Sequence, residues 1–185
     1  MFIARWLTLA CVVLGGISPR LLTAQSSADT AVPPVHLPPV AAWGFFGLGS
    51  GGVPPHSESQ LAGVAKVSLS MGPVVLSFRN TDVGPFISAG DGVRDNGLLG
   101  GVRTGGHHLF ASAVLGFANV SHYHQCDQCG RVDVDPSVRV MAYDLTAHAN
   151  YRVLGVAASF TGVTGPASVR YAAFTVGLEA GWFGR

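Results

Sequence analysis

The chain has 185 residues, of which 48% are hydrophobic and only 11% are charged, with a formal net charge of +1. This length suits a single domain, and so few ionic side chains are too few to cover a fully water-exposed surface. The 11 basic residues are balanced by 10 acidic ones, so the chain lacks the basic patch of a nucleic-acid-binding protein and no nucleic-acid partner is expected.

The N-terminal segment predicts export. Arg5 precedes a short apolar run in MFIARWLTLACVVLGGI, and small residues suited to cleavage follow near Ala24, which is the layout of a secretory signal peptide over residues 1–24. The run is shorter than the roughly 20 residues that a membrane-spanning helix needs. Residues 25–42 contain four prolines and are expected to form an extended leader before a folded domain at 43–185.

Beyond residue 43, apolar and polar residues alternate with a period of two, which predicts strands rather than helices. In QLAGVAKVSLS, Leu61, Val67 and Leu69 share one face, while Lys66 and the serines share the other. The same alternation recurs in VMAYDLTAHANY and in the last segment, TVGLEAGW. Together these runs predict eight strands, at 43–49, 60–71, 73–80, 98–104, 108–121, 138–151, 153–161 and 169–183.

The connections between the predicted strands alternate in length. GSGGVPPHSES, NTDVGPFISAGDGVRDN and HYHQCDQCGRVDVDP are long, whereas the connections at Met71-Gly72-Pro73, at Thr104 to His107 and around Arg152 are tight. An up-and-down barrel in the bacterial outer membrane sorts its connections in this way, with short turns in the periplasm and longer loops outside. The alternation therefore favours a closed antiparallel barrel.

On the opening WGFFGLGSGG and the final strand TVGLEAGW, the chain resembles the small OmpA-like and OmpX-like outer-membrane β-barrels over residues 43–183. The resemblance implies an all-β, eight-stranded antiparallel up-and-down transmembrane barrel located in the bacterial outer membrane. It also implies contact with outer-membrane lipid and lipopolysaccharide. The final strand looks like the signal that the outer-membrane assembly machinery recognises.

In such a barrel the apolar face of each strand meets lipid, and the polar face fills an interior that leaves no wide channel. Charges enclosed in that interior need partners of opposite sign. We hypothesise that Lys66, Asp144 and Glu179 form an ion-paired plug near mid-depth. The full set of charged and ionisable residues predicted to face the interior is Lys66, Arg79, Arg103, Asp144, His148 and Glu179.

Residues near the strand ends predict contacts with the membrane borders. Trp43, Tyr151 and Trp182 all fall at the predicted periplasmic end, where an aromatic girdle is expected. Arg139 and Arg170 are expected to point outward at the opposite rim. There they could meet lipopolysaccharide phosphates or simply remain in water.

The stretch HYHQCDQCG, at 122–130, is predicted to lie in the third external loop. A disulfide between Cys126 and Cys129 fits an oxidising exterior, although closing so short a loop stabilises little. The alternative is a zinc site, because His122, His124, Cys126 and Cys129 supply four ligands of the type that zinc takes. A c-type haem is not expected, since Gly130 replaces the histidine that would follow the second cysteine.

The sequence contains no complete catalytic signature and predicts no cofactor, so it favours a non-enzymatic barrel with external loops for surface interaction or membrane integrity. One alternative is a lipid-modifying hydrolase or acyltransferase that uses Ser121 and His122 with Asp144 or Glu179. Adjacent residues of a strand point to opposite faces, which separates the side chains of Ser121 and His122. The other alternative is a soluble lipocalin-like barrel, whose interior would be apolar.

Overall fold

The computed structural model describes residues 39–52, 59–85, 89–126, 130–133 and 136–183. The predicted signal peptide and most of the predicted leader lie outside these ranges, so both remain predictions. In the described part of the chain, no helix has the length and apolar character needed to cross a bilayer.

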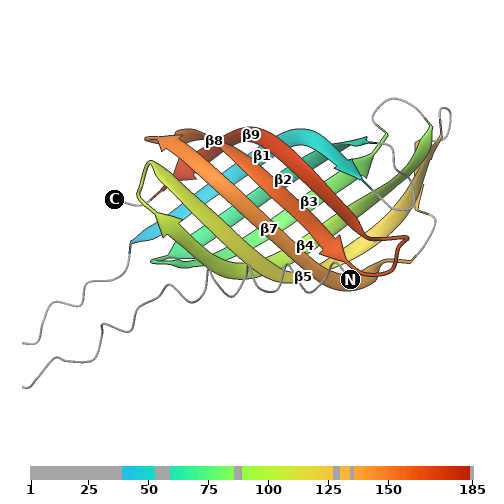
Figure 1. Cartoon of the computed structure of the whole chain (residues 1–185), viewed down its shortest axis with the longest axis horizontal. Helices are drawn as coiled ribbons and strands as arrows, with labels where there is room; N and C mark the ends of the chain where they lie inside the picture. Colours follow the sequence, from blue (N-terminus) through green and yellow to red (C-terminus); the bar gives the residue numbers. More distant parts are fainter. Residues whose placement is uncertain (1–38, 53–58, 86–88, 127–129, 134–135, 184–185) are drawn as a thin grey trace, which may run out of the picture. The chain divides into compact units, whose positions relative to one another are not determined.

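Nine strands are present among the described residues (Figure 1). The strand predicted at 138–151 has those bounds, whereas the strand predicted at 98–104 begins eight residues earlier, at Gly90. The strands are β1 (Val40–Gly52), β2 (Gln60–Met71), β3 (Val74–Gly84), β4 (Gly90–Gly105), β5 (Leu109–Cys126), β6 (Gly130–Asp133), β7 (Val138–Tyr151), β8 (Leu154–Thr164) and β9 (Tyr171–Trp182).

The described strands form one antiparallel sheet that closes on itself. Their order is β4-β3-β2-β1-β9-β8-β7-β5-β6, and β4 also pairs with β5. The circle therefore contains every strand except β6, which forms a hairpin with the end of β5. Closure pairs the backbone groups of all eight barrel strands and leaves the circle without an edge. The predicted eight-stranded up-and-down barrel is confirmed.

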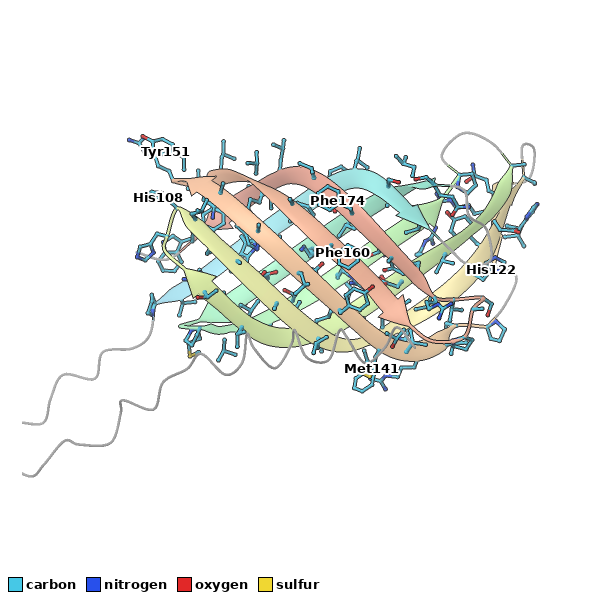
Figure 2. The ribbon with its side chains drawn as sticks, in the orientation of Figure 1. His108, His122, Met141, Tyr151, Phe160 and Phe174 are labelled. Atoms are coloured by element: carbon cyan, nitrogen blue, oxygen red, sulfur yellow. The ribbon has the colours of Figure 1, made fainter. Side chains whose placement is uncertain are left out.

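The two ends of the barrel differ in the length of their connections. Tight turns join β2 to β3, β4 to β5 and β7 to β8 at what we call the short-turn end. Gly72 and Arg152 begin two of these turns with left-handed backbones, φ 58° and 59°, a conformation that glycine adopts without steric cost. Longer connections leave from the opposite, long-loop end; Figure 2 shows His108 and His122 at these two ends.

Burial in the barrel is inverted relative to a water-soluble protein. The side chains of Phe78, Leu145 and Leu178 are 54%, 53% and 71% exposed, and Figure 2 shows Met141 and Tyr151 projecting outward from the strands. Apolar side chains thus form an outward belt around the barrel, as predicted. The charged side chains buried inside it are Lys66, Arg79, Asp95, Asp144 and Glu179.

The prediction that Trp43 belongs to an aromatic girdle is wrong. Tyr151 and Trp182 are 71% and 60% exposed, but Trp43 is only 3% exposed and faces the interior. The WGFFGLG segment has aromatic residues on both faces, with Phe45 3% and Phe46 61% exposed. Its apolar pattern therefore did not reveal which face points inward.

The strand bounds at the long-loop end also correct the sequence analysis. Residues 122–126 continue β5, and Tyr123 to Cys126 pair with β6, so this part of the stretch is not a loop. Gly90 to Gly97 similarly extend β4 and pair with β5. Both extensions contain polar residues on both faces. The apolar alternation used to find strands vanishes there because neither face has to meet hydrocarbon.

Candidate functional site

The barrel interior contains three polar clusters stacked along its length. The first surrounds Lys66, whose Nζ donates to Asp144 Oδ1 at 2.9 Å, Thr146 Oγ1 at 2.6 Å and Ser159 Oγ at 3.2 Å. Ser159 Oγ in turn donates to Asp144 Oδ2 at 3.1 Å. The ring of Phe45 covers the ammonium group, with Nζ 4.8 Å from the ring centroid. The lysine charge is thus both paired and hydrogen-bonded, as a buried cation requires.

The second cluster surrounds Arg79, which is fully buried. Its guanidinium pairs with Asp95 and donates to Tyr143 O at 2.8 Å and to the Tyr171 hydroxyl at 3.2 Å. The Tyr171 hydroxyl donates to Asp95 as well. These contacts join β3, β4, β7 and β9 across the interior, so the cluster cross-links opposite walls of the barrel.

The third cluster lies toward the short-turn end and contains Ser112, His148 and Glu179. His148 Nδ1 lies 2.6 Å from Glu179 Oε2, and His148 Nε2 lies 3.0 Å from Ser112 Oγ. The Phe110 ring stacks on the imidazole, with centroids 4.1 Å apart and planes at 10°. Trp43 packs edge-on against both rings, with its centroid 5.7 Å from that of the imidazole and 5.5 Å from that of Phe110.

The charged and ionisable residues predicted to face the interior belong to these three clusters or lie beside them. Lys66 and Asp144 are paired as hypothesised, but Glu179 joins His148 rather than that pair. Arg103 is half-buried near the short-turn end, where its guanidinium carbon lies 5.3 Å from the Phe110 centroid. Sequence reasoning missed Asp95, the partner of Arg79, because it falls in a segment that was predicted to be a loop.

A fourth cluster lies at the long-loop end, above the apolar belt. Tyr123 donates its hydroxyl to Asp82 Oδ1 at 2.6 Å. Arg131 and Arg94 both pair with Asp82, and their guanidinium carbons lie 4.6 and 5.8 Å from the Tyr123 ring centroid. Burial and the hydrogen bond to Asp82 raise the pKa of the Tyr123 hydroxyl well above its usual value. We call these four residues the outer clasp.

The HYHQCDQCG stretch is only partly described. His124 Nδ1 lies 2.8 Å from Asp91 Oδ1 across the β4–β5 pair, and His122 lies on the same strand. Among the described residues, no group of three or more histidine, cysteine or acidic side chains is arranged to hold a metal ion. Cys129 lies outside the described residues, so the disulfide with Cys126 and the zinc alternative both remain predictions.

The residues suggested for a hydrolase from the sequence do not converge. Ser121 and His122 lie at the long-loop end of β5, opposite Arg94 and Val93 of β4. Glu179 lies in the cluster toward the short-turn end, and Asp144 belongs to the Lys66 cluster. The described residues thus bring together a different serine and histidine from those that the sequence suggested.

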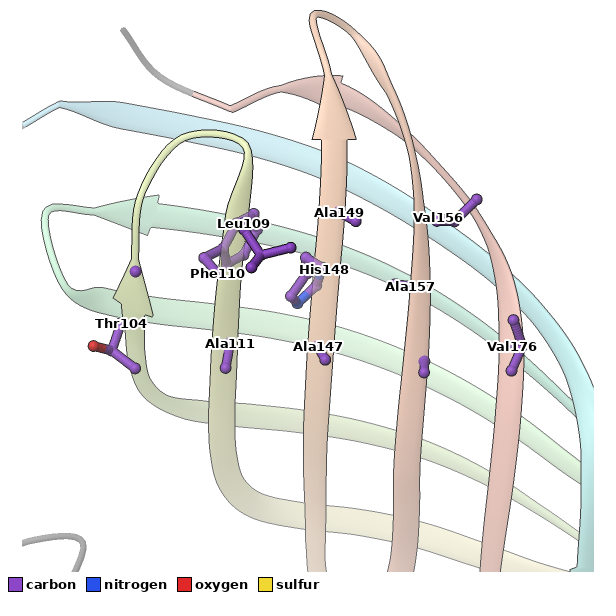
Figure 3. A pocket seen from close by; sticks show the side chains of 12 residues that line it. Thr104, Leu109, Phe110, Ala111, Ala147, His148, Ala149, Val156, Ala157 and Val176 are labelled. Carbon is purple, nitrogen blue, oxygen red and sulfur yellow. The ribbon is translucent and has the colours of Figure 1, made fainter.

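A groove of about 550 Å³ crosses the outer surface beside the third cluster (Figure 3). Its outward-facing lining is apolar and mostly small, with Ala111, Ala147 and Ala149 between Leu109 and Val176. Ala111 and Ala147 are directly opposed on β5 and β7, so paired backbone separates the groove from the interior. In a bilayer this groove would be filled by hydrocarbon chains.

No protein-family model matches the sequence. No curated protein matches it either. Solved structures do match the fold. Ail, the attachment invasion locus protein of Yersinia pestis, solved with the heparin analogue sucrose octasulfate, superposes with a TM-score of 0.53 at 11% identity, covering 77% of this chain and 97% of that chain. Neisserial surface protein A superposes with a TM-score of 0.55 at 8% identity, covering 76% and 96%.

Identities this low show a shared fold and not a shared activity. The closed barrel, the short-turn and long-loop ends and the two superpositions agree. The fold is that of the small eight-stranded outer-membrane β-barrels, which is the class that the sequence predicted.

Proposed function

We propose that this protein is an integral β-barrel of the bacterial outer membrane whose role at the cell surface is non-enzymatic. The observation that carries the proposal is the inverted burial of the barrel: Leu145 is 53% exposed, whereas Asp144 beside it on β7 is 1% exposed. In water this arrangement would place apolar side chains in solvent and charges in the core, and both are unfavourable. In a bilayer the same arrangement is favourable.

The inverted burial also disfavours a lipocalin-like barrel, because such a protein needs an apolar interior for its ligand. Here Lys66, Arg79 and His148 occupy the interior together with their partners. Their hydrogen bonds span the interior between opposite strands, which is consistent with a packed barrel rather than a wide pore.

The long-loop end supports a role in surface contact. With short turns in the periplasm, this end faces outward from the cell, and it carries the exposed Arg139 and Arg170. The guanidinium carbon of Arg139 lies 5.4 Å from the Phe117 ring centroid at the edge of the apolar belt. Arginines at that depth suit the phosphate groups of lipopolysaccharide. Ail forms a complex with sucrose octasulfate, a polysulfated anion of related chemistry.

Assembly would proceed through the last strand. β9 pairs with β1 to close the circle, and its outward face ends in the exposed Trp182 at the short-turn end. We therefore expect the outer-membrane assembly machinery to recognise β9.

The Cys126–Cys129 disulfide is part of the same proposal, and free-thiol titration of the unreduced protein tests it. Two reactive thiols together with bound zinc would favour the metal alternative.

The location is tested by membrane fractionation combined with electrophoresis before and after boiling in detergent. We expect the protein in the outer-membrane fraction and a change of mobility on boiling, because closed barrels resist detergent until heated. A protein found only in the soluble fraction, with a single mobility, would contradict the proposal.

Lipopolysaccharide contact is tested by binding of purified barrel to immobilised lipopolysaccharide. Reversing the charge of Arg139 and Arg170 together should weaken binding, and the loss should diminish at high salt because exposed charges are screened. Arg152→Glu, at the opposite end of the barrel, is the matched control and should bind as the unaltered protein does. If the unaltered protein and both variants bound equally well, Arg139 and Arg170 would not bind lipopolysaccharide.

A further inference from the structure

Ser112, His148 and Glu179 have the geometry of a nucleophile, a general base and an orienting carboxylate. His148 Nε2 lies 3.0 Å from Ser112 Oγ, and His148 Nδ1 lies 2.6 Å from Glu179 Oε2. Both separations fall within the range that defines such a relay in serine hydrolases. We propose that Ser112 is an activated nucleophile that cleaves small carboxylic esters entering from the short-turn end of the barrel.

The Glu179 carboxylate determines which atoms donate and which accept the hydrogen bonds among the three residues. Ionised Glu179 can only accept a hydrogen bond, so His148 donates from Nδ1. In the neutral imidazole this leaves Nε2 as the acceptor, and the Ser112 hydroxyl donates to it. The Phe110 ring stacks on the imidazole, and the Trp43 ring packs edge-on against both Phe110 and the imidazole, so the three rings restrict the orientation of His148. The histidine is therefore oriented by its partners before any substrate arrives.

The exposed fractions of the three residues differ in the way that a nucleophile with a buried base requires. His148 and Glu179 are each 2% exposed, whereas Ser112, at 9%, has the largest exposed fraction among the buried polar side chains of the described residues. The base and its carboxylate are shielded from water, and the proposed nucleophile is the least buried of the three residues. Trp43, Phe110 and Phe183 form the apolar lining between the relay and the short-turn end, with neighbouring ring centroids 5.5 to 6.3 Å apart.

Two donors without partners stand beside the relay. Arg103 is directly opposite Ser112 on β4, and side chains so opposed have Cβ atoms about 4.5–5.5 Å apart on the same face. Arg103 Nη1 and Trp43 Nε1 are buried and have no hydrogen-bond partner among the described residues. A buried donor without a partner is costly, and both would gain one if a substrate oxygen developed negative charge near Ser112.

The proposed reaction is acyl transfer followed by hydrolysis. Ser112 Oγ bonds to the ester carbonyl carbon as its proton passes to His148 Nε2, and the carbonyl oxygen becomes an alkoxide. When the carbonyl re-forms, the ester C–O bond breaks and the departing alkoxide takes the proton from His148. Water then attacks the acyl-serine by the same path and releases the acid. The apolar rings at the entrance favour a short acyl or aryl ester over a charged one.

This inference adds an activity to the proposed surface role and would revise the prediction that the chain is not an enzyme. It uses the short-turn end, whereas the surface role uses the long-loop end. The two proposals can therefore fail separately, because heat-shift electrophoresis reports the folded barrel and serine labelling reports the relay.

The test is covalent labelling of the folded full-length protein with diisopropyl fluorophosphate, followed by peptide mass spectrometry. We expect the label on Ser112, where the Oγ–P bond forms as fluoride leaves, together with measurable hydrolysis of p-nitrophenyl acetate. Ser112→Ala should abolish both signals. His148→Gln and Glu179→Gln should slow labelling by about 100-fold or more, the usual contribution of a general base and its support.

Ser77→Ala is the matched control. Ser77 is also a buried interior serine, but it is hydrogen-bonded to Ser68 at 2.6 Å with no histidine partner, so the variant should label Ser112 at the unaltered rate. Phe183→Ala should speed labelling, because Phe183 belongs to the aromatic lining and carries no hydrogen-bond donor. An unlabelled Ser112 in protein that still shows the heat shift would overturn the inference, as would equal labelling of Ser112 and Ser77.

Discussion

Two sets of ion pairs in this barrel involve the same residue types in different solvents. Inside the barrel, Arg79 and Asp95 are both fully buried. In the outer clasp, Arg131 and Asp82 retain 37% and 27% of their side-chain exposure. A buried pair must be complete because each charge has lost its water, whereas an exposed pair replaces water that either charge could recover. The interior should therefore govern stability, and the clasp should mainly shape the long-loop end.

The largest effect is expected from removing one member of the interior pair. Arg79→Met leaves Asp95 buried without its cation and should lower the free energy of unfolding by about 3–5 kcal/mol, measured by urea titration of the barrel in detergent or lipid. The double variant Arg79→Met with Asp95→Leu is the control and should recover most of the loss. If the single and double variants were equally destabilised, the missing partner would not be the cause.

A charge on the lipid-facing surface should have the next largest effect, and the effect should depend on depth. Leu145→Arg places a cation at the middle of β7 and should cost about 2–4 kcal/mol, whereas Leu109→Arg near the short-turn end should cost about 0–1 kcal/mol. Both side chains are exposed, at 53% and 71%, so local packing differs little between them. The same unfolding titration in lipid vesicles measures both, and equal costs would argue against a bilayer around the belt.

The smallest effect is expected in the outer clasp. Arg131→Ala removes a partly exposed partner of Asp82 and should change the free energy of unfolding by less than about 1 kcal/mol, because water screens the pair and Arg94 remains nearby. The change should shrink further in high salt. A loss as large as that of Arg79→Met would mean that the clasp is part of the cooperative core.

The sequence predicted the membrane-embedded part of the fold well, because a bilayer imposes strict alternation on each strand. Lys66, Arg79, Asp144 and Glu179 were assigned to the interior from parity alone, and all four are buried. The odd or even position of a residue in its strand gives the face on which it lies. It does not predict which interior charges form ion pairs, since that depends on the register of strands distant in sequence. Glu179 consequently pairs with His148 and not with Lys66.

Toward the long-loop end the same reasoning failed, because the apolar alternation fades there. Asp95 falls in a polar, glycine-rich segment that was predicted to be a loop, so neither its strand nor its pairing with Arg79 could be anticipated. The relay through Ser112 was missed for another reason: serine is common on the polar face of every strand. Only the register that brings His148 within 3.0 Å distinguishes this serine from the others.

The belt of apolar side chains can be examined directly with nitroxide labels at Phe78, Leu145 and Leu178, after the native cysteines are replaced by serine. In bilayers, electron paramagnetic resonance measures collisions of each label with dissolved oxygen, which concentrates in hydrocarbon, and with a water-soluble nickel complex. We predict frequent oxygen and rare nickel collisions at all three positions, and the reverse at Val132 of β6. Frequent nickel collisions at Phe78, Leu145 and Leu178 would show that the belt lies in water and would contradict the account.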